Sequence, residues 1–302
     1  MEIRNFNQQS QQEIVTPFRK IYSFDRPIEN IDFSVVNSFG EEWGKFHQFS
    51  KSEISKLGSE YFDIIDESVI NKGTYGIDIG CGTGRFSKYL SDKIGFIEAI
   101  DPSEAIFSAD KLLEDTKNVR LSIASTDNIP FDDETFDFGM SIGVLHHIPN
   151  TQKALNDCVK KVKIGGYFYV YLYYNLDNKG FLFKLLLRIV TILRKLVSRL
   201  PIKLKKIVCD IIALLVYMPI ILLGRLLRIF GLSNIAKKLP LSSYQNYTFF
   251  IIRNDALDRF GTSLEQRFSK VQVISMMEKA GLDDIRVSNK IPYWHAIGKR
   301  IR

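Results

Sequence analysis

The sequence predicts an α/β protein in which a parallel sheet binds a nucleoside, and three observations support this. A short apolar run, 75–79, turns abruptly into a glycine-rich loop, Gly80–Gly84, and then into an amphipathic stretch. Short apolar runs and helical stretches continue to alternate as far as Tyr174. Asp101 directly follows the second apolar run, where a carboxylate can accept hydrogen bonds from a ribose diol. This order is typical of the first half of a nucleoside-binding sheet, with the ligand at the carboxyl ends of the strands.

The regular elements can be placed in order along the chain. Residues 1–70 read as a leader followed by a helical cap, with helical spacing of apolar residues from Gly40 to Ser68. We then expect strands near 75–79, 96–100, 119–123, 136–142 and 167–174, with helices near 84–93, 103–115 and 151–162 between them. Gly165 and Gly166 are expected to end the last of these helices. A capping box at Ser269–Gln272 begins a further helix, and strands follow at 284–288 and 293–299.

Composition and charge narrow the class of protein. The chain has 302 residues, enough to bury a sizeable core, and a net charge of +7. Residues 175–240 hold 13 Lys or Arg against 2 Asp, so +11 belongs to this segment and −4 to the remainder. Basic residues that gather away from the glycine loop argue against a nucleic-acid enzyme. The three cysteines match no metal or disulfide spacing, and the polar N-terminus has no apolar signal region, which predicts a cytoplasmic protein.

The spacing of the glycines distinguishes between nucleosides. Gly80, Gly82 and Gly84 form G-x-G-x-G with Asp78 two residues earlier, whereas a dinucleotide site has G-x-G-x-x-G. This motif resembles the first motif of class I S-adenosylmethionine-dependent methyltransferases. The later motifs of that family follow in order, over about a third of the chain: Asp101, then 126–131, 136–147 and 163–168. The most similar subgroup is the small-molecule type that includes the quinone-biosynthesis methyltransferases.

The resemblance implies a fold and a domain organisation. The fold is a Rossmann-like, seven-stranded methyltransferase sheet with helices on both faces and a mostly helical insertion after the fifth strand. Residues 71–174 and 241–302 would form the S-adenosylmethionine-binding core, and 175–240 the insertion.

The resemblance also implies a cofactor and its contacts. The cofactor is S-adenosylmethionine, the product is S-adenosylhomocysteine, and no metal is expected. The expected contacts are the loop residues Asp78, Gly80, Cys81, Gly82 and Gly84 for the methionyl part, Asp101 and Pro102 for the ribose, Thr126, Asp127 and Asn128 for adenine, and Ser141 and Gly143 beside the sulfonium. Structural alternatives stay open for each: the glycines could form an empty turn, Asp101 could cap the helix near Ser103, and Asp127 could be a turn residue.

Two adjacent histidines are the catalytic candidates. His146 and His147 follow the fourth strand, and imidazole is the side chain whose ordinary pKa suits a general base near neutral pH. A structural or substrate-lining role competes for both. His295 reads as a packed residue at the sheet edge rather than a ligand.

The insertion has the pattern of a membrane-surface element. Within 181–200, Lys184, Arg188, Lys195 and Arg199 lie on one helical stripe, and apolar side chains fill most of the remaining circumference. Residues 207–224 are more apolar still, and their length could just cross a bilayer core. In the family the last strands complete the sheet that the first strands begin, so both ends of the insertion must share one compartment. We therefore expect 181–230 to be a surface-lying or re-entrant hairpin, peripheral or monotopic on the inner face of an anionic membrane. The alternatives are that it caps the protein or forms a homo-oligomer.

These observations predict a methyltransferase that acts on oxygen, nitrogen or carbon of a small acceptor, lipophilic or linked to a lipid or isoprenoid. The alternatives are an RNA methyltransferase and a non-catalytic protein of this fold that binds a membrane or a partner through its basic insertion. The first is disfavoured because Ser141–Val144 stands where amino-group base methylases carry N-P-P-[FY].

Overall fold

The chain folds into two compact units. The computed structural model describes residues 3–25, 29–43, 49–178 and 180–302. We call Met1–Lys179 with Leu264–Arg302 the core unit, and Gly180–Ser263 the helical unit. The sequence placed the end of the insertion at Pro240, but the helical unit continues to Ser263 because a further helix, Phe249–Gly261, belongs to its apolar core.

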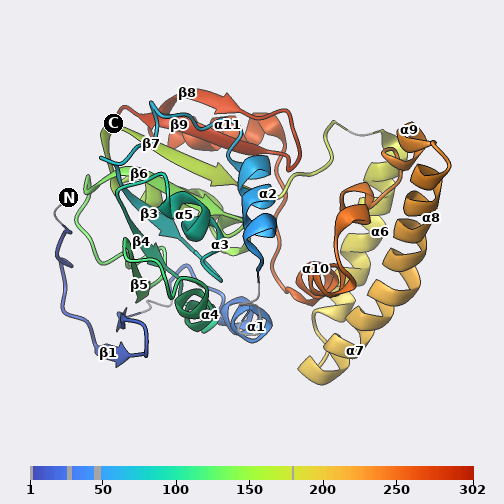
Figure 1. Cartoon of the computed structure of the whole chain (residues 1–302), viewed down its shortest axis with the longest axis horizontal. Helices are drawn as coiled ribbons and strands as arrows, with labels where there is room; N and C mark the ends of the chain where they lie inside the picture. The colour runs from blue at the N-terminus through green and yellow to red at the C-terminus, as the bar shows by residue number, and fades with distance from the viewer. Residues whose placement is uncertain (1–2, 26–28, 44–48, 179) are drawn as a thin grey trace. The chain divides into compact units, whose positions relative to one another are not determined.

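The core unit is built on one sheet (Figure 1). Its strands are β1 (Gln12–Val15), β2 (Lys20–Ser23), β3 (Tyr75–Ile79), β4 (Phe96–Ile100), β5 (Val119–Ile123), β6 (Phe136–Ile142), β7 (Val162–Tyr171), β8 (Leu282–Val287) and β9 (His295–Arg300). They lie in the order β1-β2-β5-β4-β3-β6-β7-β9-β8. Strands β2 to β7 pair in parallel, while β9 runs antiparallel to both β7 and β8 and β1 antiparallel to β2. Seven strands, from β5 to β8 in this order, form the predicted methyltransferase sheet.

The two extra strands correct the predicted strand count, which was seven. Thr16 and Pro17 turn the leader back on itself, because the Thr16 hydroxyl accepts from the backbone N–H of Arg19 and donates to its carbonyl. Arg19 then reaches the core, where its Nη1 donates to Val119 O at 3.1 Å and its Nε lies 3.0 Å from Asp110. These long-range contacts add the hairpin to the edge of β5, and no local sequence pattern predicts them.

Helices cover both faces of the sheet, as predicted. Those of the core unit are α1 (Phe33–Trp43), α2 (Lys51–Tyr61), α3 (Arg85–Ser91), α4 (Ala105–Leu112), the 3₁₀ turn η1 (Leu145–His147), α5 (Thr151–Val159) and α11 (Lys270–Lys279). Alternate strand residues point to opposite faces: Ile77 packs with α5 and α11, whereas Ile97 packs with α3 and α4.

Of three local predictions, one is confirmed, one is confirmed in part and one is wrong. The capping box at Ser269 is present, with Ser269 Oγ accepting from Gln272 N at 3.2 Å. The helical stretch expected at 40–68 contains the end of α1 and all of α2, and α2 begins with a capping box at Ser50. Residues 44–48 lie outside the described residues, and the helix stops at Tyr61 rather than near Ser68. Gly165 and Gly166 do not end a helix: α5 stops at Val159, and both glycines lie within β7. A side chain at Gly166 would meet the carbonyl of Asp137 at 2.6 Å, so glycine is needed for strand packing there.

The helical unit has a small apolar core of its own. It contains α6 (Phe181–Val197), α7 (Ile202–Ile212), the π-helical turn η2 (Ala213–Tyr217), α8 (Met218–Ile229), α9 (Ser233–Ala236), the 3₁₀ turn η3 (Ser242–Asn246) and α10 (Phe249–Gly261). The segments α7, η2 and α8 follow one another without a break and form one long rod in Figure 1. Cys209, Ala213 and Ile221 on one side of this rod pack against Ile252 and Ala256 of α10.

Candidate cofactor and active site

The glycine loop joins β3 to α3 at the carboxyl edge of the sheet. Gly80, Gly82 and Gly84 all have positive φ, at 78°, 54° and 76°. A Cβ at Gly80 would lie 2.5 Å from the side chain of Val144, so the loop can approach β6 only without one. No described atom lies within 4 Å of a Cβ built on Gly82. The loop therefore turns a bare backbone toward open space, where a ligand can approach closely.

Asp78 supports this loop from inside the protein. It lies on β3, is 1% exposed, and its Oδ2 accepts a 2.6 Å hydrogen bond from Ser87 Oγ on α3. The pKa of Asp78 is raised to about 7, mainly by burial; the hydrogen bond from Ser87 opposes this rise, and the nearby Asp101 carboxylate adds to it. The side chain is thus poised to be either neutral or charged near neutral pH. A cation beside it would favour the charged form.

Asp101 lies at the end of β4 and faces the loop. Its Oδ2 accepts from Gly82 N at 2.9 Å, and its Oδ1 accepts from Ser103 N at 2.8 Å and Ser103 Oγ at 2.6 Å. The structure thus brings Asp101 to the predicted place, and it also shows the turn contact with Ser103 that competes with ribose binding. Burial raises the pKa of Asp101, and these hydrogen bonds partly oppose that shift. Pro102 and the 6%-exposed Cys81 lie beside it along the loops, and burial also raises the pKa of the Cys81 thiol.

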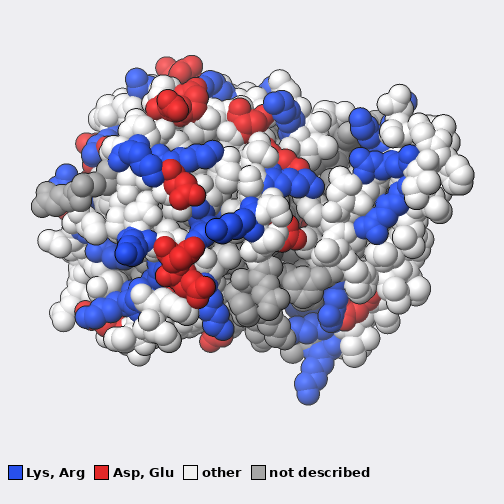
Figure 2. Space-filling model, in the orientation of Figure 1, with Lys and Arg blue, Asp and Glu red and all other residues white. Residues whose placement is uncertain are grey.

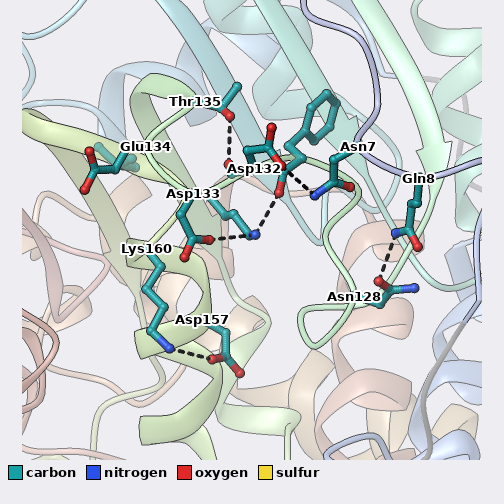
Figure 3. Close-up of polar contacts among 12 residues, drawn as sticks. Asn7, Gln8, Asn128, Asp132, Asp133, Glu134, Thr135, Asp157 and Lys160 are labelled. Carbon is teal, nitrogen blue, oxygen red and sulfur yellow. Dashed lines mark hydrogen bonds and ion pairs between the residues drawn. The ribbon is translucent and has the colours of Figure 1, made fainter.

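The residues predicted to contact adenine follow β5. Thr126 Oγ1 lies 3.4 Å from Asp127 Oδ1, and Asp127 Oδ2 accepts from Asn30 N at 3.2 Å. The Asn128 side chain donates to Asp25 O at 2.9 Å and accepts from Gln8 Nε2 at 2.9 Å (Figure 3). The leader therefore holds this loop in place, a function that the sequence did not suggest for it.

The two residues predicted beside the sulfonium lie at the end of β6. Ser141 is fully buried, and its hydroxyl donates to Ile79 O at 2.9 Å, which ties β6 to β3. Gly143 has φ 76°, and no described atom lies within 4 Å of a Cβ built there. Gly82 and Gly143, in the loops that follow the neighbouring strands β3 and β6, thus both border open space. Ser141 has a structural bond where a cofactor contact was predicted, so its proposed contact with the ligand would run through its backbone.

The histidine pair lies in η1, directly after these residues. His147 Nδ1 lies 2.7 Å from Leu264 O, and because a carbonyl only accepts, Nδ1 carries the proton and Nε2 is the acceptor in the neutral ring. His146 is fully buried, and its ring stacks on that of Tyr173 with the two ring centroids 3.9 Å apart. Neither of its ring nitrogens has a hydrogen-bond partner within the described residues. Burial lowers the pKa of His146 well below its ordinary value, with His147 and Arg267 adding to the shift. His146 is therefore neutral at physiological pH.

Sequence reasoning missed the segment Leu264–Phe268, which lies against both histidines. Gln266 N donates to His146 O at 2.9 Å, and Phe268 N donates to Tyr173 O at 2.8 Å. Glu265, with a side chain that is 3% exposed, pairs with Arg267 Nε at 2.7 Å. No motif marks this segment, since its place depends on how the chain returns to the core unit.

His295 is a structural residue, in agreement with the interpretation of the sequence. Its ring is fully buried, with Nε2 at 2.6 Å from Asp63 Oδ1 and Nδ1 at 2.6 Å from Pro292 O. Both ring nitrogens are thus held by hydrogen-bond partners from other parts of the core unit. The bond to Asp63 joins β9 to the loop after α2.

In the part of the chain that the structure describes, a cavity lies apart from this site and no metal-binding cluster is present. Among the described residues, no group of three His, Cys, Asp or Glu side chains could hold a metal ion. A cavity of about 580 Å³ lies between the β1–β2 turn and α4, lined by Phe18, Phe107 and Lys111 among others, and it contains none of the predicted site residues.

The strand order and the loops at the carboxyl edge define an α/β domain of the methyltransferase topology. Residues 77–170 match the family described as methyltransferase domain. Residues 77–170 therefore belong to a class I S-adenosylmethionine-dependent methyltransferase domain.

Curated relatives are similar over this domain. The chain is 29% identical to a sterol 4-C-methyltransferase of Caenorhabditis elegans over 49% of each chain. It is 24% identical to the ubiquinone biosynthesis O-methyltransferase of Coxiella burnetii over 39% of this chain and 49% of that one. It thus spans about half the length of these relatives. A solved S-adenosylmethionine-dependent methyltransferase of Aquifex aeolicus is 16% identical, with 83% of this chain and 97% of that one covered at a TM-score of 0.43.

Proposed function

We propose that this protein transfers the methyl group of S-adenosylmethionine to a small, lipophilic or lipid-linked acceptor. The observation that carries the proposal is the convergence of the Gly80–Gly84 loop, Asp101 and Asp127 at the carboxyl ends of three adjacent parallel strands, β3, β4 and β5. In a doubly wound sheet this edge is where ligands bind.

The residues present fit the cofactor. Bound S-adenosylmethionine would supply a sulfonium methyl group whose leaving group is a neutral thioether, so most of the catalysis is orientation. Asp78, with a pKa of about 7, would be held in its charged form by the α-amino group. Asp101 would use its remaining lone pair for the ribose hydroxyls, and Asp127 would accept from adenine, with Thr126 and Asn128 alongside. The open sides of Gly82 and Gly143 would admit the methionyl chain and the sulfonium.

The two histidines would contact the acceptor molecule. His147 Nε2 is the ring atom able to accept a proton, because the Leu264 carbonyl keeps the proton on Nδ1. We assign His147 as the group that hydrogen-bonds the acceptor and takes up its proton. The low pKa of His146 makes it a weak base, so we assign it to lining the site with a neutral ring, which does not repel a sulfonium.

The class of acceptor is supported by the relatives, whose names give a sterol and ubiquinone biosynthesis. Sterols and ubiquinone are both lipophilic, and an acceptor of that class resides in a membrane. We therefore propose that the enzyme works peripherally at a membrane surface, on a cytoplasmic face. The acceptor atom is oxygen, nitrogen or carbon.

Calorimetric titration with S-adenosylhomocysteine tests the cofactor assignment. We expect one site for the wild type, and at least a tenfold loss of affinity for Asp101→Ala because a charge-assisted bond to the ribose is removed. Asp92→Ala, an exposed carboxylate at the end of α3, is the matched control and should bind normally. A folded wild type that does not bind would instead favour the non-catalytic alternative.

Transfer is tested with methyl-labelled S-adenosylmethionine. Incubation with a total lipid extract should give solvent-extractable label, and His147→Gln should reduce the rate while leaving S-adenosylhomocysteine affinity unchanged. Label that enters purified tRNA but not lipid would revive the RNA methyltransferase alternative.

A further inference from the structure

The outward face of α6 is built for an apolar environment. The inward face of the helix carries Arg194 and Val197, which are buried in the helical unit. The opposite arc, at 100° per residue, consists of eight large apolar side chains that are 41–76% exposed: Phe181, Leu182, Leu185, Leu186, Ile189, Ile192, Leu193 and Leu196. The apolar arc is thus separate from the surface that the unit needs for its own core.

A basic stripe runs along one flank of this arc. Lys184, Arg188 and Lys195 recur at positions that fall within about 40° of one another on the helix, between the inward face and the apolar arc, and Arg199 follows in the turn after the helix. All four are exposed. A helix with a core-facing side, an apolar outer side and a cationic flank is typical of one that lies in the plane of a membrane surface.

The long rod from α7 to α8 presents a second apolar face. Eleven exposed apolar side chains lie on its outer side or at its end: Leu204, Ile207, Ile211, Leu214, Leu215, Val216, Leu222, Leu223, Leu226, Ile229 and Phe230. Lys203–Ile229 is long and apolar enough to cross a membrane by length and composition. The helical unit holds 22 of the 31 exposed large apolar residues of the described chain, far more than a soluble unit of 84 residues ordinarily exposes.

Charge indicates which partner covers these faces. The helical unit carries 14 Lys or Arg against 3 Asp, a net charge of +11, and its surface in Figure 2 is mostly white with mainly blue charges. Pairing two copies through these faces would bring +11 against +11, which opposes a dimer. An anionic lipid surface complements both the charge and the apolar arcs.

Sheet topology indicates how the membrane is met. In the sequence, the helical unit comes after β7 and before β9. These two strands are neighbours in one sheet, with Tyr169 opposite Ile297. One crossing by the rod would put the two strands on opposite sides of the membrane. A second crossing would need α6, which contains four cations, or α10, whose 13 residues span only about 20 Å against the ~30 Å of a bilayer core.

We propose that the outward faces of α6 and of the α7–α8 rod dock in the plane of an anionic lipid bilayer, with the apolar arcs among the acyl chains and the basic stripe at the phosphates. This surface goes beyond the methyl transfer proposed above and stands independently of it.

Flotation of the full-length protein with vesicles tests the proposal. Wild type should bind phosphatidylcholine vesicles containing 30% phosphatidylglycerol about tenfold or more tightly than pure phosphatidylcholine vesicles. Reversal of three flank charges, Lys184→Glu, Arg188→Glu and Lys195→Glu, should lower the partition coefficient on the order of 100-fold. The matched control reverses three exposed lysines of the core unit, Lys51, Lys72 and Lys117, and should lose far less.

An apolar variant separates insertion from electrostatic attraction. Ile189→Asn, Leu193→Asn and Leu196→Asn together retain every charge, and these side chains lie outside the apolar core of the unit, so we expect a folded protein with at least tenfold weaker binding to both vesicles. Failure of the wild type to bind either vesicle, equal binding to both, or a stable dimer without affinity for vesicles would each overturn the proposal. S-adenosylhomocysteine affinity, measured on the same samples, reports on the core unit alone. A wild type that does not bind S-adenosylhomocysteine would contradict the methyltransferase proposal, but it would not contradict the docking surface.

Discussion

Replacement of Asp78 by asparagine should stabilise the cofactor-free protein above neutral pH. The carboxyl group is buried on β3 with one short hydrogen bond, from Ser87, and its pKa is about 7 against an ordinary 3.8. A carboxyl group whose pKa is raised in the folded state binds its proton more tightly there than in the unfolded chain. Stability is therefore lost as pH rises from about 4 to about 7, and Asp78→Asn, which has no proton to lose, escapes this loss.

The size of the effect follows from the shift. A raised pKa of about three units, at 1.36 kcal/mol per unit, corresponds to about 4 kcal/mol of destabilisation once Asp78 is fully ionised. This is an upper figure, because the asparagine amide must itself find a hydrogen-bond partner in a buried place. We expect a gain of about 2–4 kcal/mol for Asp78→Asn at pH 8 and little difference at pH 5.

Urea unfolding of both proteins without cofactor, between pH 5 and pH 8, measures this difference. The wild-type midpoint should fall relative to that of Asp78→Asn as pH rises toward 7 and then level off. Parallel curves would refute the reasoning, since they would mean that Asp78 has the same pKa in the folded and unfolded states. Cofactor affinity should change in the opposite sense: the asparagine variant should bind S-adenosylhomocysteine more weakly, and wild-type affinity should rise with pH up to about 7 as the carboxylate forms.

Three further changes test other parts of the core unit. Gly80→Ala should abolish S-adenosylhomocysteine binding and lower thermal stability, because its Cβ would meet Val144 at 2.5 Å at a φ of 78°; normal binding by calorimetry would contradict the loop geometry. Ser269→Ala removes a capping box and should lower the free energy of unfolding in urea by about 1 kcal/mol without changing cofactor affinity. An unchanged unfolding midpoint would show that the cap does not stabilise the protein. His295→Ala should cost about 1–3 kcal/mol at pH 7, because Asp63 loses its hydrogen bond to the ring and keeps its contacts with Ser288 and Lys290. Although burial opposes it, hydrogen bonding to His295 lowers the pKa of Asp63, so this cost should shrink as acid protonates Asp63 below about pH 4; a pH-independent difference would argue against the ion pair.

Much of the fold could be predicted because its signals are local. The glycine loop, the apolar runs of β3, β4, β5 and β6 and the cap at Ser269 each depend on a few adjacent residues, and the structure places them within a residue or two of the prediction. The leader hairpin could not be predicted, because Arg19 finds its partners about a hundred residues away, at Val119 and Asp110. The prediction that Gly165 and Gly166 end a helix is wrong for the same reason: at Gly166 the constraint is the approach of the Asp137 carbonyl, which the local sequence does not reveal.

The candidate site divides in the same way. By itself the sequence determined which residues are candidates for the chemistry, since the spacing of Gly80, Gly82 and Gly84 and the acids after each strand are properties of neighbouring positions. Only the tertiary structure decided the state of those residues. Burial sets the pKa of Asp78, and Leu264, more than a hundred positions from His147, selects the tautomer of that ring. Solvation and long-range hydrogen bonds arise only when distant segments pack together, so no local pattern could have specified them.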